Sequence, residues 1–152
     1  MLYIKEMKED DDNVVVVGEV NKANAEFYHA FERLSMEMMD KLWKHDDNVV
    51  CIHPGWDLFS GWLAIRESWI TIFSNTEMMR FIITNTKVRI FDNNLAVVVC
   101  LENIETPVNG QVIKMGVIAT NVFERNELNQ WLLIHHHGST VSNYIPPNIS
   151  SQ

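Results

Sequence analysis

Histidine is the residue type in this chain best suited to moving a proton near neutral pH, and one histidine stands at a notable place. His53 comes directly before Pro54, at the end of the short apolar run 49–52. An imidazole with an unperturbed pKa of about 6.5 is a suitable general base or acid. The alternative role is structural, a hydrogen bond that caps the end of the strand. Asp57 and Glu102 are carboxylates that could orient this ring.

Three consecutive histidines, residues 135–137, follow the apolar residues 131–134. Adjacent residues on a strand point to opposite faces, so at most two of the three can share one side. Two imidazoles make a weak metal site, and no HxxxH or paired-cysteine spacing adds ligands. The chain also lacks a nucleophile elbow, a phosphate-cradling glycine loop and a dinucleotide fingerprint. We therefore expect no metal and no organic cofactor, and we expect any reaction to be a proton transfer.

Aromatic residues cluster around the loop after the first short strand and in the segment that follows it. They are Trp56, Phe59, Trp62 and Trp69. Such side chains could wall an apolar ligand pocket, although core packing is the alternative and is favoured for Trp62. If Glu102 faced such a pocket, burial would raise its pKa. If it faced outward, it would be an ordinary surface charge.

The elements that must position these residues are helices in the first half of the chain and strands in the second. Apolar residues at spacings of three and four predict a helix over residues 21–44 that Asn21 caps, and a second helix over 60–73 that Ser60 caps. Turn residues separate four predicted strands, joined as hairpins, over residues 80–91, 95–105, 111–124 and 130–141.

This order of elements carries a family resemblance. The elements are a helix, a short strand ending at His53 and Pro54, a helix opening at Gly61 and a meander ending in residues 131–139. Over residues 21–141 this order resembles the nuclear transport factor two-like superfamily, and more narrowly its SnoaL-like branch. The resemblance implies an α+β fold: a cone-shaped, cystatin-like roll in which N-terminal helices pack on a strongly curved mixed or antiparallel sheet. Relatives include ketosteroid isomerases, polyketide cyclases, dehydratases, epoxide hydrolases and a kinase association domain.

The resemblance also implies which residues would form a catalytic site. His53 stands where the isomerases carry a carboxylate base, and Asn121 where they carry an acidic hydrogen-bond donor. Trp69 matches a pocket aromatic, eight residues after Gly61. Tyr28 lies near the phenol that stabilises their oxyanion. Because a histidine and an asparagine replace the two acids, the resemblance does not imply a steroid isomerase.

In the register that the resemblance implies, one face of the sheet would line the cone. Alternate residues share a face. The lining set is Val98, Cys100 and Glu102, then Val117, Ala119 and Asn121, then Ile134, His136 and Gly138. A one-residue slip in the last strand would replace His136 by His135 and His137.

Composition and charge limit the class of protein. The chain has 152 residues, 47% of them hydrophobic, which suits one domain. We expect an acidic arm over residues 1–20, in which 14–17 could add an edge strand or lie partly ordered, a cone domain over 21–141 and a tail over 142–152. A net charge of −8 argues against a nucleic-acid partner.

Several features favour a cytoplasmic location. No apolar run is long enough to span a membrane, and the first residues do not form a secretory signal. Cys51 and Cys100 lie in apolar runs, as buried thiols do.

The outer face of the sheet is expected to be buried as well as the inner face. Residues 95–101 are apolar at both odd and even positions, so apolar side chains point to both faces. We expect a homodimer through the outer face.

Two interpretations of function remain open. In the first, the chain binds a small, largely apolar molecule in the cone. It either only binds this molecule or also acts on it as an isomerase, cyclase or dehydratase, with His53 moving a proton while Asn121 and His136 hold a polar ligand atom. The expected ligand contacts are Tyr28, Trp56, Asp57, Phe59, Trp69, Val98, Cys100, Glu102, Ala119 and Ile134. In the second, the chain is a non-catalytic dimerisation or association module with a vestigial pocket.

Overall fold

The computed structural model describes the backbone of residues 2–148 and the side chains of residues 12–148. Residue 1 of the expected arm and residues 149–152 of the expected tail lie outside the described residues. The elements in chain order are α1 (Leu2–Glu32), α2 (Met36–Leu42), β1 (Val50–Ile52), β2 (Phe59–Ser60), α3 (Trp62–Ser74), β3 (Arg80–Phe91), β4 (Leu95–Val108), β5 (Gln111–Arg125) and β6 (Trp131–Thr140).

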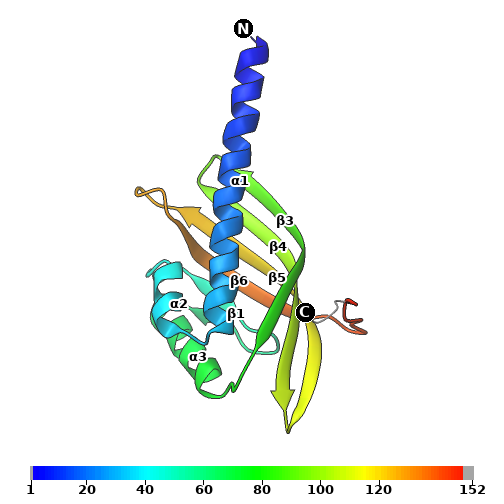
Figure 1. Ribbon diagram of the computed structural model, residues 1–152. Coiled ribbons are helices and arrows are strands. Elements are labelled where there is room, and N and C mark those ends of the chain that lie inside the picture. Colours follow the sequence, from blue (N-terminus) through cyan, green and yellow to red (C-terminus); the bar gives the residue numbers. More distant parts are fainter. Residues whose placement is uncertain (1, 149–152) are drawn as a thin grey trace.

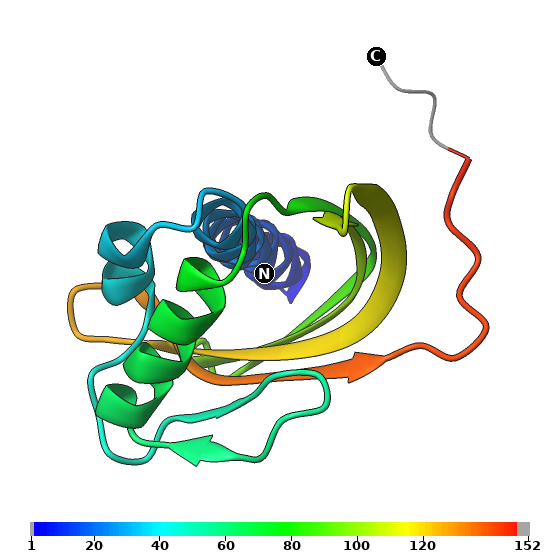
Figure 2. The same ribbon diagram turned by 90° about the horizontal axis from the view of Figure 1, so that it is seen from below.

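The strands form one curved, mixed sheet in the order β2-β1-β6-β5-β4-β3. Strands β3 to β6 pair antiparallel, whereas β1 pairs parallel with β6. The sheet bends around α1, and α2 and α3 lie on the same side as α1 (Figure 1, Figure 2). The predicted α+β fold, with helices packed on a strongly curved mixed sheet, is confirmed.

The four long strands follow the sequence prediction closely, and their turns explain why. Asp92 and Asn93 have φ values of 50° and 53°, and Asn109 and Gly110 have φ values of 52° and 78°. Asn109 and Gly110 form a two-residue turn of the kind that matches the twist of paired strands. Asp92 and Asn93 belong to a three-residue connection, in which the Asn94 N–H donates to the Phe91 carbonyl. The turn residues therefore fix both hairpins locally.

Residues 14–17 belong to α1, and the predicted edge strand or partly ordered arm is wrong for them. Val16 and Val20 are buried, in phase with Ala23 and Phe27 farther along the same helix. The apolar stripe thus continues toward the N-terminus at helical spacing. In Figure 1 the N-terminal part of α1 rises clear of the sheet.

The single helix predicted over residues 21–44 is two helices. Leu34 has a φ of 52°, a left-handed conformation that ends the α1 segment. Ser35 then caps α2, because its side chain accepts a 3.1 Å hydrogen bond from the Met38 N–H. Asn21 lies inside α1 rather than at its start.

The helix α3 begins one residue later than the predicted cap implies. Gly61, with a φ of 88°, occupies the capping position, and no side chain caps this helix. The predicted cap, Ser60, belongs to β2 instead. The Gly61 N–H donates to the Val49 carbonyl at 2.8 Å, which ties the start of α3 to β1.

The register of the long strands aligns polar residues on the inner face of the sheet. Asn121 pairs with Val98 on one side and with His136 on the other. The next inner row joins Cys100, Ala119 and Gly138 in the same way. Asn121 and His136 are therefore neighbours across two strands.

One residue departs from the predicted inner face. Val122 pairs with His135, but Phe123 pairs with Leu133, so Ile134 is an extra residue in β6. This bulge reverses the alternation: Leu133 is fully buried, and Ile134 lines a groove on the outer face. The prediction that Ile134 lines the cone is wrong.

Candidate functional site

Polar side chains are buried together between α1, α3 and the inner face of the sheet, where the surrounding core is apolar. Those at the inner face are Asn24, His53, Ser68, Glu102, Asn121 and His136. Buried polar groups are costly unless they are paired. Their hydrogen bonds therefore define the site.

Glu102 on β4 and Tyr28 on α1 form the first pair. The Tyr28 hydroxyl donates to Glu102 Oε2 at 2.6 Å. It also lies 3.3 Å from Cys100 Sγ, and because its only proton is used on Glu102, the thiol is the donor there. The hydroxyl oxygen accepts a further bond from Asn121 Nδ2 at 3.1 Å.

Asn121 extends this chain of hydrogen bonds to His136. Its Nδ2 donates both to Tyr28 and, at 2.9 Å, to Asn24 Oδ1. Its Oδ1 lies 2.5 Å from His136 Nδ1, so that ring nitrogen must carry the proton and donate. His136 is thus held as the Nδ1–H tautomer, with Nε2 left as an acceptor.

His53 is oriented by a separate partner on α3. Its Nε2 lies 2.9 Å from Ser68 Oγ, and that hydroxyl donates its own proton to the Ile65 carbonyl at 2.6 Å. His53 Nε2 is therefore the donor, and Nδ1 is the free acceptor. Cys51 Sγ lies 3.6 Å from Nε2 and 3.9 Å from Nδ1, which gives only weak contacts.

A cavity of about 180 Å³ opens among these groups. Its polar lining comes from His53, Glu102 and His136. Its apolar lining comes from α1, α3, the loop after β1, the loop before β3 and the sheet: Phe31, Pro54, Trp56, Ile72, Met79, Ile104, Met115 and Val117. The cavity is mostly apolar with a few convergent polar groups, which is typical of a small-molecule site.

The pKa values separate the three titratable groups of the cavity. Burial raises the pKa of Glu102 to about 7, and the hydrogen bond from Tyr28 opposes the rise. Burial lowers the pKa of His53 to about 4. Burial, with the neighbouring His53, lowers the pKa of His136 to about 3. At neutral pH both histidines stay uncharged, and Glu102 is the group of the three whose pKa lies near neutrality.

The remaining groups of the network stay protonated. Burial and the charge of Glu102 raise the pKa of Tyr28 well above its usual value. Burial also raises the pKa of Cys51, and it raises that of Cys100 to about 11. Both thiols therefore stay protonated at neutral pH.

The structure brings some of the predicted site residues together and separates others. Trp56 lines the cavity and is 41% exposed, whereas Phe59 is half-buried, 5.9 Å from the Trp56 ring centre. Asp57 is exposed, and in the described part of the chain it makes no hydrogen bond to His53. Ser68, not a carboxylate, orients that ring.

Other predicted contacts lie in the packed core beside the cavity. Val98, Cys100 and Ala119 are buried on the inner face but do not line the cavity. Trp69 is fully buried with its ring centre 4.6 Å from that of His53, in an edge-to-face arrangement. Trp69 therefore packs against His53 instead of lining the cavity.

Two residues of the network were not identified from the sequence. Asn24 lies one helical turn before Tyr28, so the i, i+4 spacing could have revealed it. Ser68 is a small polar residue on the apolar face of α3, directly before Trp69. A polar residue on a face that packs into a core signals a partner there.

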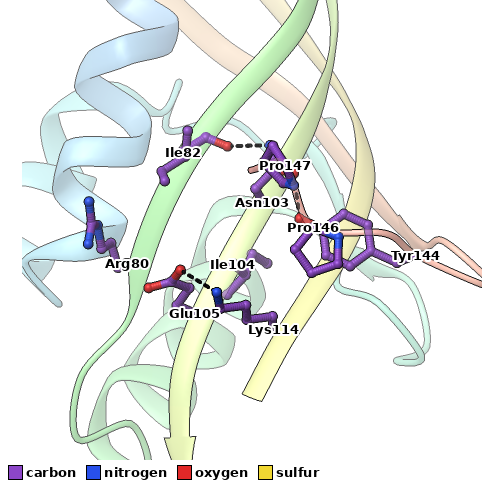
Figure 3. A pocket seen from close by; sticks show the side chains of 9 residues that line it. All are labelled: Arg80, Ile82, Asn103, Ile104, Glu105, Lys114, Tyr144, Pro146 and Pro147. Atoms are coloured by element: carbon purple, nitrogen blue, oxygen red, sulfur yellow. Dashed lines mark hydrogen bonds and ion pairs between the residues drawn. The ribbon is translucent and has the colours of Figure 1, made fainter. Parts of the chain in front are cut away.

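A second hollow, of about 270 Å³, lies where the C-terminal segment crosses the strands (Figure 3). Tyr144 donates a 2.5 Å hydrogen bond to Asn103 Oδ1, and its ring covers Gly116, where a Cβ atom would overlap it. None of the predicted site residues lines this hollow. Its lining is Arg80, Ile82, Asn103, Ile104, Glu105, Lys114, Tyr144, Pro146 and Pro147.

Neither a metal centre nor a membrane-spanning helix is present among the described residues. No group of three or more His, Cys, Asp or Glu side chains within that part of the chain is arranged to hold a metal ion. No helix in it is long and apolar enough to cross a membrane.

Known proteins with solved structures match both the fold and the sequence. A candidate dehydratase of the NTF2-like family from Streptomyces avermitilis is 34% identical, with a TM-score of 0.77, over 84% of this chain and 97% of that one. A candidate association domain of calcium/calmodulin-dependent protein kinase type II from Thiobacillus denitrificans is 28% identical, with a TM-score of 0.70, over 79% of this chain and 93% of that one.

A third similar protein is the F-box protein SKIP8 of Arabidopsis thaliana, which is 27% identical over 150 residues. The match covers 92% of this chain but spans only 62% of that protein. Residues 20–143 match the SnoaL-like domain. With this match and the solved relative at 34% identity, the chain belongs to the SnoaL-like family of the NTF2-like superfamily.

Proposed function

We propose that this chain binds a small, largely apolar molecule in its cone cavity and moves a proton on it, as an isomerase or dehydratase would. The observation that carries the proposal is the position of Glu102. Its carboxyl group lines an apolar cavity, has one oxygen fixed by Tyr28 and has a pKa of about 7. A general base is most effective when its pKa lies near the working pH.

Glu102 is a better proton acceptor in this site than His53, to which the sequence analysis gave that role. The only ring proton of His53 is donated to Ser68, and its pKa of about 4 makes Nδ1 a weak base. In the proposal His53 and His136 accept hydrogen bonds from the ligand. Asn121 acts behind them, because it holds the His136 ring in one tautomer.

Size and similarity support a modest substrate. A cavity of about 180 Å³ is smaller than the roughly 300–1,000 Å³ of sites for drug-sized ligands, so a steroid does not fit within it. The similar protein from Streptomyces avermitilis is described as a candidate dehydratase. A reaction that begins by removing a proton from carbon is common to dehydratases and isomerases.

Proton transfer can be measured without knowing the natural substrate. Cyclohexanone, acetophenone and 2-hydroxyacetophenone have exchangeable protons next to a carbonyl group. In D2O at pH 8, NMR would follow the loss of these proton signals. We expect the wild-type protein to accelerate the exchange of 2-hydroxyacetophenone, the probe whose hydroxyl group can donate to a cavity acceptor, and Glu102→Gln to abolish the acceleration.

The matched control is Glu105→Gln, which removes a carboxylate that pairs with Lys114 outside the cavity. It should leave the exchange rate unchanged. If Glu102→Gln and the wild-type protein exchange all three probes at the same rate, the proposed base is wrong.

A second candidate function is that of an association module, and one observation favours it. The outer face of the sheet is apolar: Ile118 is 43% exposed, and Val122 and Ile134 line a groove of about 490 Å³. An exposed apolar face of this kind marks an interaction surface. The 28% identical protein from Thiobacillus denitrificans is described as a candidate association domain. Under this candidate the face pairs with a second copy of the chain.

Sedimentation velocity distinguishes the association module from a monomer. The wild-type chain is expected to sediment as a dimer, and the double variant Ile118→Glu, Val122→Glu as a monomer, because both changes place charges in the apolar face. Leu128→Glu alters a residue that is 78% exposed in the β5–β6 turn and serves as the control. A wild-type chain that remains monomeric at high concentration would exclude this candidate.

A cytoplasmic location is part of the proposal. Cys51 and Cys100 are free and buried within the described core, as is usual where thiols stay reduced. Fluorescence microscopy of the tagged chain tests this location.

A further inference from the structure

The size of the cone cavity limits its occupant to about one ring. An apolar cavity of about 150 Å³ in a protein core is known to hold one benzene molecule. The cavity here measures about 180 Å³ and has a lining of aromatic, aliphatic and methionine side chains. A six-membered ring with a short polar substituent fills such a volume.

The polar atoms available to this occupant are acceptors. Above pH 7, where Glu102 is mostly ionised, Tyr28 uses one carboxylate oxygen, which leaves Oε1 as an acceptor. The bond to Asn121 fixes the proton of His136 on Nδ1, which leaves Nε2 as an acceptor. The bond to Ser68 fixes the proton of His53 on Nε2, which leaves Nδ1 as an acceptor. Each of these three residues lines the cavity.

Two of these three acceptors have no hydrogen-bond partner within the described part of the chain. Among residues 12–148, no nitrogen or oxygen donor bonds to Glu102 Oε1 or His136 Nε2. The fully buried side-chain nitrogen and oxygen atoms of this part of the chain that lack a hydrogen-bond partner are Trp43 Nε1, Trp69 Nε1 and Arg125 Nε. Glu102 Oε1 and His136 Nε2 lack a partner but are not among these atoms, so neither is fully buried. Both acceptors therefore face accessible space.

The one lining side chain with a free donor lies toward solvent. Trp56 carries an indole N–H, but its side chain belongs to a residue that is 41% exposed, so water is within reach. The buried part of the lining consequently presents acceptors and apolar surface. A ligand that offers only acceptors, such as a ketone or an ether, would leave them unpaired.

We propose that the cone cavity binds a one-ring molecule bearing a hydroxyl or primary amino group, whose O–H donates to Glu102 or His136, or whose N–H groups donate to both. The inference rests on the proposed function and specifies the ligand class of the same site. An alcohol and an amine share the required donor. A carbonyl compound of the same size lacks it.

Four probes of equal heavy-atom count separate these classes: 1-phenylethanol, 1-phenylethylamine, acetophenone and isopropylbenzene. Met79 and Met115 line the cavity, so protein labelled with ¹³C at the methionine methyl groups reports its occupation by NMR. Met78, which is 58% exposed, serves as an internal control. The signals are assigned by single Met→Leu variants and titrated with each probe at pH 8, where Glu102 is mostly ionised.

We expect the alcohol or the amine to bind at least about tenfold more tightly than acetophenone and isopropylbenzene, because only a donor satisfies the buried acceptors. The stronger of the two identifies the preferred donor. In Glu102→Gln the side-chain amide adds an N–H donor, so the preference should shift toward acetophenone. The Glu105→Gln variant should keep the wild-type preference.

The outcomes separate the ligand class from the proposed site. If acetophenone shifts the Met79 and Met115 signals at the same concentration as the alcohol and the amine, the donor class is wrong while binding in the cone stands. If no probe shifts either signal, both the ligand class and the binding function are overturned.

Discussion

The Tyr28 hydroxyl lies 2.6 Å from Glu102 Oε2 and joins helix α1 to strand β4 across the inside of the cone. The two residues are 74 positions apart in the sequence. The bond fixes one carboxyl oxygen and leaves the other toward the cavity. The same hydroxyl accepts from Asn121, so this contact also connects Glu102 to the partner of His136.

Removing the phenol should make Glu102 a stronger base. The hydrogen bond from Tyr28 stabilises the charged carboxylate and so lowers its pKa. In Tyr28→Phe we expect the pKa of Glu102 to rise above its wild-type value. NMR titration of ¹³C-labelled glutamate measures this change. An unchanged or lower pKa in Tyr28→Phe would contradict the assigned bond.

Glu102 should make the protein less stable as pH rises. Its folded pKa of about 7 lies above the unfolded value near 4.5, so the folded state holds the proton longer. The stability from this group is complete below about pH 4.5 and is lost as pH rises to about 7. Relative to Glu102→Gln, the wild-type free energy of unfolding should fall by about 3 kcal/mol across this interval. Urea unfolding at several pH values measures it, and parallel curves for the two proteins would refute it.

The buried histidines should make the protein less stable as pH falls. Burial lowers the pKa of His53 to about 4 and that of His136 to about 3, so below about pH 6.5 the unfolded chain binds protons that the folded chain does not. Stability is therefore lost as pH falls from 6.5 toward these values. Between pH 6.5 and 5 we expect each of His53→Gln and His136→Gln to lose about 2 kcal/mol less than the wild-type protein.

The same urea experiment at pH 6.5 and pH 5 tests both histidine variants. Glu102 is present in each protein, so its own pH dependence cancels in the comparison. A replacement of the exposed His29 is the control and should follow the wild-type curve. Equal losses in the wild-type protein and both variants would show that the histidines are not held neutral.

The contact between Tyr144 and Gly116 should stabilise the end of the described chain. Tyr144→Phe removes the hydrogen bond to Asn103 and should lower the free energy of unfolding by about 1 kcal/mol. Gly116→Ala should displace the tyrosine ring. The double variant should then lose no more than Gly116→Ala alone, since the bond is already broken.

Thermal or urea unfolding measures this cycle, with Gly18→Ala as a control in an exposed part of α1. A Cβ atom at Gly18 meets nothing within 4 Å, so alanine should stabilise the helix there by about 1 kcal/mol. Full additivity of the Gly116 and Tyr144 changes would mean that the two residues do not interact.

The sheet could be predicted from the sequence because its signals are local. Residues such as Asn109 and Gly110 mark the turns, and alternation along each strand sets the faces. Two local exceptions carried no such signal. Leucine is an uncommon left-handed residue, so the end of α1 at Leu34 was missed, and nothing in residues 131–137 marks Ile134 as a bulge.

The chemistry of the site depends on contacts that are not local. The sequence supplies Glu102, His53 and His136, but not the partners that decide their protonation. Tyr28 and Ser68, from two different helices, determine which oxygen or nitrogen remains free. These hydrogen bonds therefore favour Glu102 over His53 as the proposed proton acceptor.

The most direct test of the central claim is the titration of Glu102 itself. Its δ-carbon signal in ¹³C-glutamate-labelled protein can be assigned by its absence from Glu102→Gln and followed from pH 4 to pH 9. A buried carboxyl group poised for proton transfer should titrate at about pH 7. A midpoint at about pH 4–5, as for an exposed glutamate, would contradict the claim that Glu102 exchanges a proton in the cavity.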